Sequence, residues 1–180
     1  MKTNLKFRNK FLYGIGGLGY SSMSQTLNNF IMFFGTSVMG ISGSLVGIAV
    51  AISSLWDGVS DPLIGHLSDN TNNKFFGKRL GFMFFGIFII ALLNICIWSM
   101  PASLPEIGKF LWLLVGMLAI ESANTCFGTP YAALAIDLAP DYNEQSKIQG
   151  FKTVFSIMGM VLPSILMYFF MPSISISIQA

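Results

Sequence analysis

Long apolar runs separated by short polar stretches dominate this chain. A helix needs about 20 mostly apolar residues to cross the hydrocarbon core of a bilayer. Five runs meet that length, at residues 11–36, 44–67, 80–100, 109–136 and 151–171. None of them alternates with period two as a barrel strand does, and lipid does not tolerate unpaired backbone groups. We therefore predict an all-α membrane protein, a helical bundle at 1–171 with a short tail at 172–180.

Composition supports a place in the lipid bilayer. Apolar residues make up 53% of the chain and charged residues only 10%, against roughly 25% charged in soluble domains. The net charge of +2 offers no electrostatic footprint for nucleic acid. Cys96 and Cys126 lie inside apolar runs, which favours small buried side chains over a disulfide or a metal pair. The basic start precedes a run longer than a signal-peptide core, so we expect it to be retained as the first span.

The distribution of lysine and arginine predicts the orientation. In an alternating topology only Lys109 falls on one side. The other nine cations fall on the opposite side, and they are Lys2, Lys6, Arg8, Lys10, Lys74, Lys78, Arg79, Lys147 and Lys152. Cytoplasmic loops carry the excess of positive charge, so we predict a multi-pass protein of the cell membrane with a cytoplasmic N-terminus. Five spans ending in PSISISIQA form an unusual endpoint, and we expect a truncated product or a fragment.

Two aspartates inside the second run carry the clearest chemistry. Asp57 and Asp61 are four residues apart, hence on one helix face, with Asp57 roughly 15 Å deep in the bilayer. Intramembrane charges are costly unless paired, and neither acid has an obvious basic partner. Two such carboxylates repel each other and should hold protons or bind a small cation, either H⁺ or Na⁺. The alternative is structural: they cap a kink before Pro62 or bond neighbouring helices.

Polar stripes on two other runs suggest a hydrated cavity. The fourth run carries Glu121, Asn124, Thr125 and Gly128 on one face, and the first run carries Ser21, Gln25, Asn28 and Asn29. A polar stripe in lipid must face protein or water. Hydroxyl-rich substrates need a lining of hydrogen-bond donors and acceptors of this kind. Hydrogen bonding between helices is the alternative explanation for any single residue of these stripes.

Two further patterns point away from enzymatic chemistry. Gly14, Gly16 and Gly19 spell GxGxxG, but no strand precedes them, so close helix packing explains them better than a dinucleotide site. The same interpretation covers Gly43 and Gly47. His66 is the single histidine and has no nearby nucleophile or metal-ligand spacing. We therefore expect no enzyme.

Three stretches resemble a known transporter family. WDGVSDPLIG at 56–65, with the following SDNTNNKFFGKRLG, resembles the second helix and cytoplasmic loop of the glycoside-pentoside-hexuronide:cation symporters, the melibiose-permease-like branch of the major facilitator superfamily. GTPYAALAIDLAPDYNEQSKIQGFK at 128–152 resembles their fourth helix, the next loop and the start of the fifth helix. With the KFLYGIGGLG opening, the resemblance extends to about residue 171.

The resemblance implies a fold and an activity. Family members hold their substrate between two six-helix halves, so this chain would be an N-terminal part that lacks its sixth helix and the whole second half. It implies cation-coupled symport of a sugar or glycoside, with no cofactor besides the coupling ion, Na⁺ or H⁺. Asp57 and Asp61 would take the places of the cation-binding aspartates, with Ser60 and Thr125 beside them. With sodium as the coupling ion, the two aspartates would be metal ligands.

The substrate side departs from the family pattern. Positions that hold sugar-gripping acids in the melibiose permease are Ser21 and Gly128 here, and its stacking tryptophan is Ala132, so galactoside specificity is not implied. Lys152 falls where that permease has an arginine near the sugar. Candidate substrate-binding residues are Ser21, Gln25, Asn28, Glu121, Asn124, Gly128 and Lys152. A non-transporting remnant and a membrane interaction protein are the alternative functions.

Overall fold

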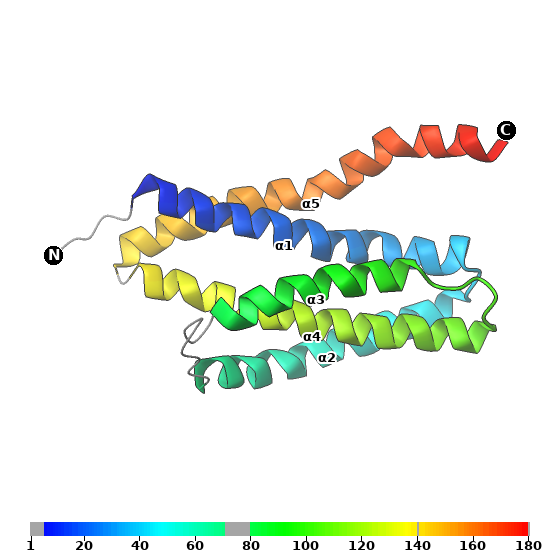
Figure 1. The fold of residues 1–180 in the computed structure, drawn as a ribbon, viewed down its shortest axis with the longest axis horizontal. Helices are drawn as coiled ribbons and strands as arrows, with labels where there is room; N and C mark the ends of the chain where they lie inside the picture. Colours follow the sequence, from blue (N-terminus) through cyan, green and yellow to red (C-terminus); the bar gives the residue numbers. More distant parts are fainter. Residues whose placement is uncertain (1–5, 71–79, 140, 180) are drawn as a thin grey trace. The chain divides into compact units, whose positions relative to one another are not determined.

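The computed structural model describes residues 6–70, 80–139 and 141–179 (Figure 1). The described residues form α1 (Phe7–Phe33), α2 (Gly43–Asn70), α3 (Leu80–Trp98), α4 (Glu106–Leu138) and α5 (Tyr142–Gln179). A five-residue π-helix, η1 (Phe34–Val38), continues α1. The all-α prediction is confirmed. Lys2, Lys74, Lys78 and Arg79, which enter the orientation argument, lie outside the described residues, as does most of the loop that follows WDGVSDPLIG.

The helices correspond to the predicted runs but differ from them at their ends. The third run ends at Trp98 rather than at residue 100, and the second and fourth runs extend by a few residues at each end. The largest difference is in α5, which continues to Gln179 through most of the predicted tail at 172–180. Serine and isoleucine lower helix propensity only slightly, so their alternation there does not stop a helix that is already formed.

Four of the described helices are long and apolar enough to cross a membrane. They are α2 over Gly43–Ser68, α3, α4, and α5 over Tyr142–Phe169. At 27 residues α1 has the length. Its polar stripe lowers the mean hydropathy, and α1 is not among the four. The first span, predicted at 11–36, therefore rests on length and on the family resemblance rather than on hydropathy.

The chain divides into two compact units. The first unit contains α1 as far as Asn29 together with the chain from Ala135 onwards. Within it, α1 and α5 pack closely at glycines. A Cβ added to Gly159 would collide with the backbone of Leu18, and one added to Gly14 would lie 2.6 Å from the Phe155 ring. The predicted packing role is confirmed for Gly14, whereas a Cβ at Gly19 would meet nothing within 4 Å among the described residues.

Polar groups add to this unit at both ends of the α1–α5 contact. The Ser22 hydroxyl donates a hydrogen bond to the Gly159 carbonyl at 3.0 Å. At the start of α5, the buried Glu144 carboxylate forms ion pairs with Lys10 at 2.6 Å and with Lys147 at 2.8 Å. A buried charge is tolerated when it is paired in this way. Lys10 thus ties the beginning of α1 to the beginning of α5.

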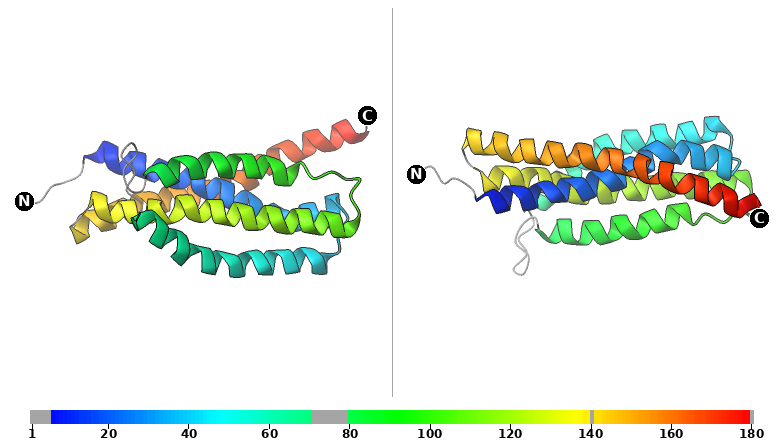
Figure 2. Two further views of the ribbon diagram at one scale, coloured as in Figure 1. Left: turned by 60° about the horizontal axis from the view of Figure 1, so that its bottom comes forward. Right: turned by 90° about the horizontal axis from the view of Figure 1, so that it is seen from above.

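The second unit spans Phe30–Leu134 and contains η1, α2, α3 and most of α4. Both views of Figure 2 show α4 lying between α2 and α3. A Cβ on Gly86 of α3 would lie 3.2 Å from the backbone nitrogen of Phe127, which shows how closely α3 approaches α4. The Gly43 and Gly47 pair does not behave as predicted. A Cβ on Gly43 would meet only the Thr36 side chain, at 3.8 Å, and a Cβ on Gly47 would meet nothing within 4 Å among the described residues.

The first turn of α4 holds the connection between η1 and α2. The Glu106 carboxylate accepts a hydrogen bond from the backbone nitrogen of Ser42 at 2.9 Å. One turn later, the Lys109 ammonium donates to the Met39 carbonyl at 2.8 Å. Gly40 lies between these two anchored residues with a φ of +68°, a left-handed conformation that glycine adopts without strain. These contacts help to hold the α2 and α4 termini together.

Candidate functional site

Three of the predicted cation-binding residues meet where α2 contacts α4. We define the α2–α4 seam as the contact of Trp56, Asp57 and Ser60 with Ser122 and Thr125. The Thr125 hydroxyl lies 3.4 Å from Asp57 Oδ1 and 3.1 Å from the Ser60 hydroxyl. Ser60 and Thr125 are each only 3% exposed. Helical periodicity explains why Asp57 and Ser60 share one face of α2, three residues apart. The structure therefore brings three of the four predicted cation ligands together.

The Thr125 hydroxyl has more possible partners than hydrogens. Besides Asp57 and Ser60, it lies 3.0 Å from the carbonyl of Glu121 one turn earlier on α4. A threonine hydroxyl donates one hydrogen and offers two lone pairs. Its hydrogen therefore goes to only one of these three oxygens at any moment, and the 3.4 Å contact to Asp57 is at the long limit of hydrogen bonding. This arrangement leaves oxygen lone pairs free to accept a cation.

Asp61 and Glu121 extend the acidic character of the seam. Asp57, Asp61 and Glu121 all lie within electrostatic reach of one another. Asp61 is exposed on α2, whereas Glu121 is part-buried and accepts a hydrogen bond from the Asn124 amide at 3.3 Å. In the low dielectric of a bilayer such a group of carboxylates favours any bound positive charge.

Asn124 has an unsatisfied buried atom. Its side chain is 4% exposed, and its amide oxygen has no hydrogen-bond partner among the described residues. Buried polar atoms are nearly always paired, so an orphan acceptor indicates that a further donor belongs beside it. Such a donor could be a substrate hydroxyl, a water molecule or another part of the protein. Asn124 is the residue directly before Thr125.

The remaining substrate-side candidates lie in the first unit or further along α4. Ser21 is buried on α1, Asn28 is exposed, and Gln25 donates a hydrogen bond to Asn29 at 2.8 Å. The aliphatic stem of Lys152, on α5, packs against Gly17. These residues belong to the first unit, and the seam residues to the second. Gly128 follows Thr125 by three residues on α4.

One contact of the seam was not anticipated from the sequence. The indole nitrogen of Trp56 donates a hydrogen bond to the Ser122 hydroxyl at 2.8 Å. Ser122 in turn donates to the Leu118 carbonyl at 2.8 Å. The available signal was adjacency, because Trp56 precedes Asp57 and Ser122 lies one turn before Thr125. Helical spacing alone cannot tell which residue of another helix such a side chain meets.

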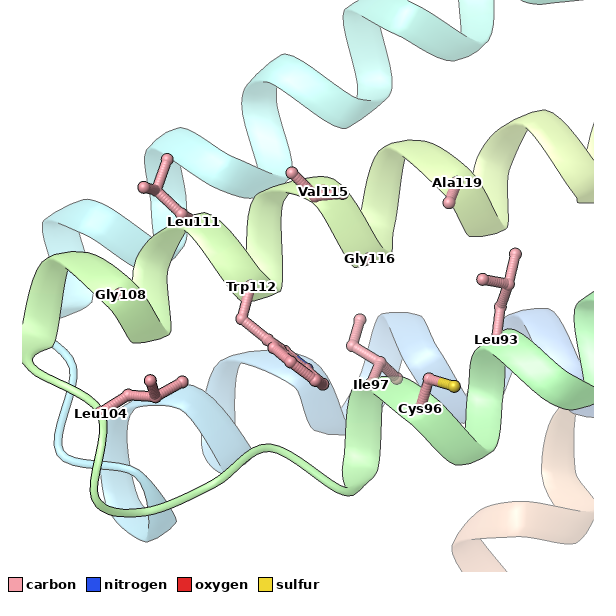
Figure 3. A pocket seen from close by; sticks show the side chains of 10 residues that line it. All are labelled: Leu93, Cys96, Ile97, Leu104, Gly108, Leu111, Trp112, Val115, Gly116 and Ala119. Carbon is pink, nitrogen blue, oxygen red and sulfur yellow. The ribbon is translucent and has the colours of Figure 1, made fainter.

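An apolar pocket between α3 and α4 provides a contrast to the seam (Figure 3). It has a volume of about 520 Å³. Its lining residues, none of them charged, are Leu93, Cys96, Ile97, Leu104, Gly108, Leu111, Trp112, Val115, Gly116 and Ala119. A hard cation or a hydroxyl-rich solute needs oxygen and nitrogen partners, which these side chains do not supply.

Within the described part of the chain, no three His, Cys, Asp or Glu side chains are grouped so that they could hold a metal ion. A cation at the seam would therefore depend on hydroxyl and carbonyl oxygens in addition to carboxylates. The oxygen atoms of Ser60 and Thr125 are of the required type, because hard cations take oxygen ligands of several kinds. The donor set thus fits a small monovalent cation or a proton better than a transition metal.

Comparison with known proteins identifies the family. Residues 12–177 match the family described as MFS/sugar transport protein. The chain belongs to this family. Its members are transporters of the major facilitator superfamily, not enzymes, and the resemblance to the melibiose-permease-like symporters is confirmed.

Individual relatives of the chain are described as symporters, but their descriptions differ in the solute that they name or leave unnamed. An uncharacterised symporter of Synechocystis is 33% identical over 90% of this chain and 30% of its own length. The sodium-dependent lysophosphatidylcholine symporter 1-B of Danio rerio is 24% identical over 89% of this chain and 30% of its own. The inner membrane symporter YicJ of Escherichia coli is 26% identical over 91% of this chain and 35% of its own length. The chain thus spans about a third of the length of these relatives.

Proposed function

We propose that this chain is the N-terminal portion of a cation-coupled symporter in which Na⁺ or H⁺ binds at the α2–α4 seam and drives entry of a sugar or glycoside. The observation that supports it is the junction of Asp57, Ser60 and Thr125 across the two helices. Two further carboxylates, Asp61 and Glu121, lie within electrostatic reach of Asp57. Polar groups at this depth of a membrane helix are retained for binding or transfer of ions.

The seam supports binding of either coupling ion. With Na⁺, the Thr125 hydrogen would turn to the Glu121 carbonyl, and its lone pairs, the Ser60 oxygen and the carboxylates of Asp57 and Asp61 would face the ion. With H⁺, Asp57 would carry the proton and donate to Thr125 instead. In both cases the bound charge relieves repulsion among the acids, so ion binding strengthens the contact between α2 and α4.

Coupling to a substrate follows from the sequence of α4. Thr125, on the ion side, is adjacent to Asn124, whose buried amide oxygen lacks a partner among the described residues. A sugar hydroxyl is a suitable donor for that atom. Glu121 and Gly128 continue the substrate side on α4. The other predicted substrate residues, Ser21, Gln25, Asn28 and Lys152, belong to the first unit. A substrate that orders Asn124 would thereby affect the adjacent cation ligand.

A lysophospholipid is the second candidate substrate. Several relatives are named sodium-dependent lysophosphatidylcholine symporters, and each matches 89% of this chain. The replacement of the sugar-gripping acids by Ser21 and Gly128 is compatible with such a change of substrate. The sugar remains the first candidate because the polar stripes of α1 and of α4 are each rich in the hydrogen-bonding groups that hydroxyl-rich solutes need.

Uptake into proteoliposomes tests the proposal. The 180-residue chain and a version extended through the coding sequence that follows it would be assayed with labelled monosaccharides, disaccharides and lysophosphatidylcholine, with and without sodium or pH gradients. We expect gradient-driven uptake by the extended form, abolished by Asp57→Asn. Asp141→Asn, which changes an exposed acid outside the seam, is the matched control and should transport normally. Absence of uptake by either folded form would favour a non-transporting remnant or a membrane interaction protein.

A further inference from the structure

Two cross-helix links lie side by side in the α2–α4 seam. The first joins the Trp56 indole nitrogen to the Ser122 hydroxyl at 2.8 Å. The second joins Asp57 and Ser60 to Thr125 at 3.4 and 3.1 Å. The α2 partners, Trp56 and Asp57, are adjacent in sequence, and the α4 partners are one turn apart on one face. Any movement that changes the first link must therefore also change the second.

The two links differ in how many arrangements each permits. An indole N–H can only donate, and the Ser122 hydroxyl already gives its hydrogen to the Leu118 carbonyl at 2.8 Å, so the bond from Trp56 to Ser122 has one direction. The Thr125 hydrogen has three oxygen atoms within reach, on Asp57, Ser60 and Glu121. The first link is thus fixed, and the second can rearrange when an ion arrives.

We propose that Trp56 is a positioning residue for the cation site, which it serves by holding α2 against α4 through Ser122. The inference rests on the proposed function, since it concerns the affinity of the ion site at Asp57. Trp56 does not touch the ion. It sets the separation of Asp57 from Thr125, so that the oxygen ligands are already spaced for the ion before it binds.

The physical reason lies in the environment of the bond. The seam lies in helices apolar enough to span a membrane, where little water competes for the indole N–H. The Trp56 side chain is 41% exposed, and the hydrogen bond to Ser122 is its polar link to α4. When the bond is lost, Asp57 and Thr125 sample a wider range of separations. Ion affinity then falls although every ligand is still present.

Carbodiimide labelling of Asp57 measures that affinity on the 180-residue chain itself. Dicyclohexylcarbodiimide reacts with protonated carboxyls in apolar surroundings, and a bound cation protects them. In liposomes, labelling of Asp57 would be quantified by mass spectrometry while sodium chloride replaces choline chloride at constant ionic strength. The readout is the sodium concentration that halves the labelling. If the wild-type chain responds to pH and not to sodium, the pH of half-labelling takes its place.

Three variants should give a defined pattern. Trp56→Phe, which keeps an aromatic ring without the N–H, should raise the sodium midpoint about three- to tenfold, the range expected for one lost hydrogen bond. Ser122→Ala should raise it equally, and the double variant should add nothing, because all three remove the same bond. Ser122→Thr, which retains a hydroxyl, should have the sodium midpoint of the wild-type chain. A residue with a merely structural role would lower the unfolding temperature without this pattern.

Trp112→Phe is the matched control. The exposed fraction of Trp112, 39%, is similar to the 41% of Trp56, and Trp112 lines the apolar pocket. Its replacement should leave the midpoint unchanged. A Trp56→Phe midpoint equal to that of Trp112→Phe, additive effects in the double variant, or failure of Ser122→Thr to restore the midpoint would overturn the positioning role. Labelling that responds to neither ion in the wild-type chain would instead contradict the cation site and remove the basis of the inference.

Discussion

Helix α4 takes part in two regions that differ in their chemistry. Along its first half, from Gly108 to Ala119, it lines the apolar pocket shared with α3. In the next turns, Ser122 and Thr125 form the seam with α2 through hydrogen bonds. The pocket has space and no charged groups, whereas the seam has a carboxylate and hydrogen bonds between its two helices. In a bilayer an apolar cavity is compatible with lipid tails at little cost, but carboxylates inside a membrane span are costly and point to binding.

The comparison also separates two uses of small residues. In the pocket, Gly108 and Gly116 leave space, and a Cβ on Gly116 would lie only 3.1 Å from Ile97. In the seam, Ser60 and Thr125 are small side chains that fill the contact and add oxygen atoms. Close approach of helices is common to both regions. Polar side chains, rather than volume, distinguish the candidate site.

The largest expected effect is at Asp57. Asp57→Asn removes the negative charge and keeps the size, so protection of the neighbouring carboxylates from carbodiimide by sodium should disappear. The loss should exceed about 100-fold in apparent affinity, since a paired charge in a low dielectric contributes several kcal/mol. Protection would be measured at Asp61 and Glu121. Unchanged protection in Asp57→Asn would show that the ion binds elsewhere.

A smaller effect is expected at Thr125. Thr125→Val preserves the shape but removes the oxygen that faces Asp57 and Ser60, and the sodium midpoint should rise about tenfold. Thr125→Ser keeps the hydroxyl and should stay within about twofold of the wild-type chain. The midpoint of Asp57 labelling measures both. Equal values for the valine and serine variants would remove Thr125 from the ligand set.

Labelling of the two cysteines should distinguish the pocket from its surroundings. Cys96 is exposed and lines the pocket, whereas Cys126 is part-buried. In liposomes an apolar maleimide, which partitions into lipid, should modify Cys96 several times faster than Cys126. Cys96→Ala and Cys126→Ala chains provide the separate rates by mass spectrometry. If Cys126 reacted faster, the pocket would be less accessible from the lipid than its lining indicates.

The smallest effect is expected from filling the pocket. Ala119→Leu adds apolar volume to a space of about 520 Å³ and should leave the sodium midpoint of Asp57 labelling within about twofold of the wild-type value. Its unfolding temperature should stay the same or rise slightly, because added methyl groups fill empty space. Trp56→Phe serves as the comparison. A midpoint shift as large as that of Trp56→Phe would show that the two regions are coupled through α4.

Much of the candidate site could be predicted because helical order is local. The spacing of Asp57 and Ser60, and that of Glu121, Asn124 and Thr125, follows from 3.6 residues per turn. The clash that a side chain at Gly159 would cause with α1 could not be predicted, nor could the open space around Gly43 and Gly47. Each depends on where a second helix passes. The continuation of α5 past Met171 was missed because its Ser-Ile alternation looks unlike a helix.

The sequence by itself determined the all-α membrane class, the polar stripes, the intramembrane acids and the membership in a symporter family. These properties depend on composition, on the helical period and on local motifs. Only the tertiary structure decided that Thr125 meets Asp57 and Ser60, that Trp56 donates to Ser122, and that an apolar pocket opens between α3 and α4. Their physical cause is the register between helices, which many packing contacts set together and which no single stretch of sequence contains.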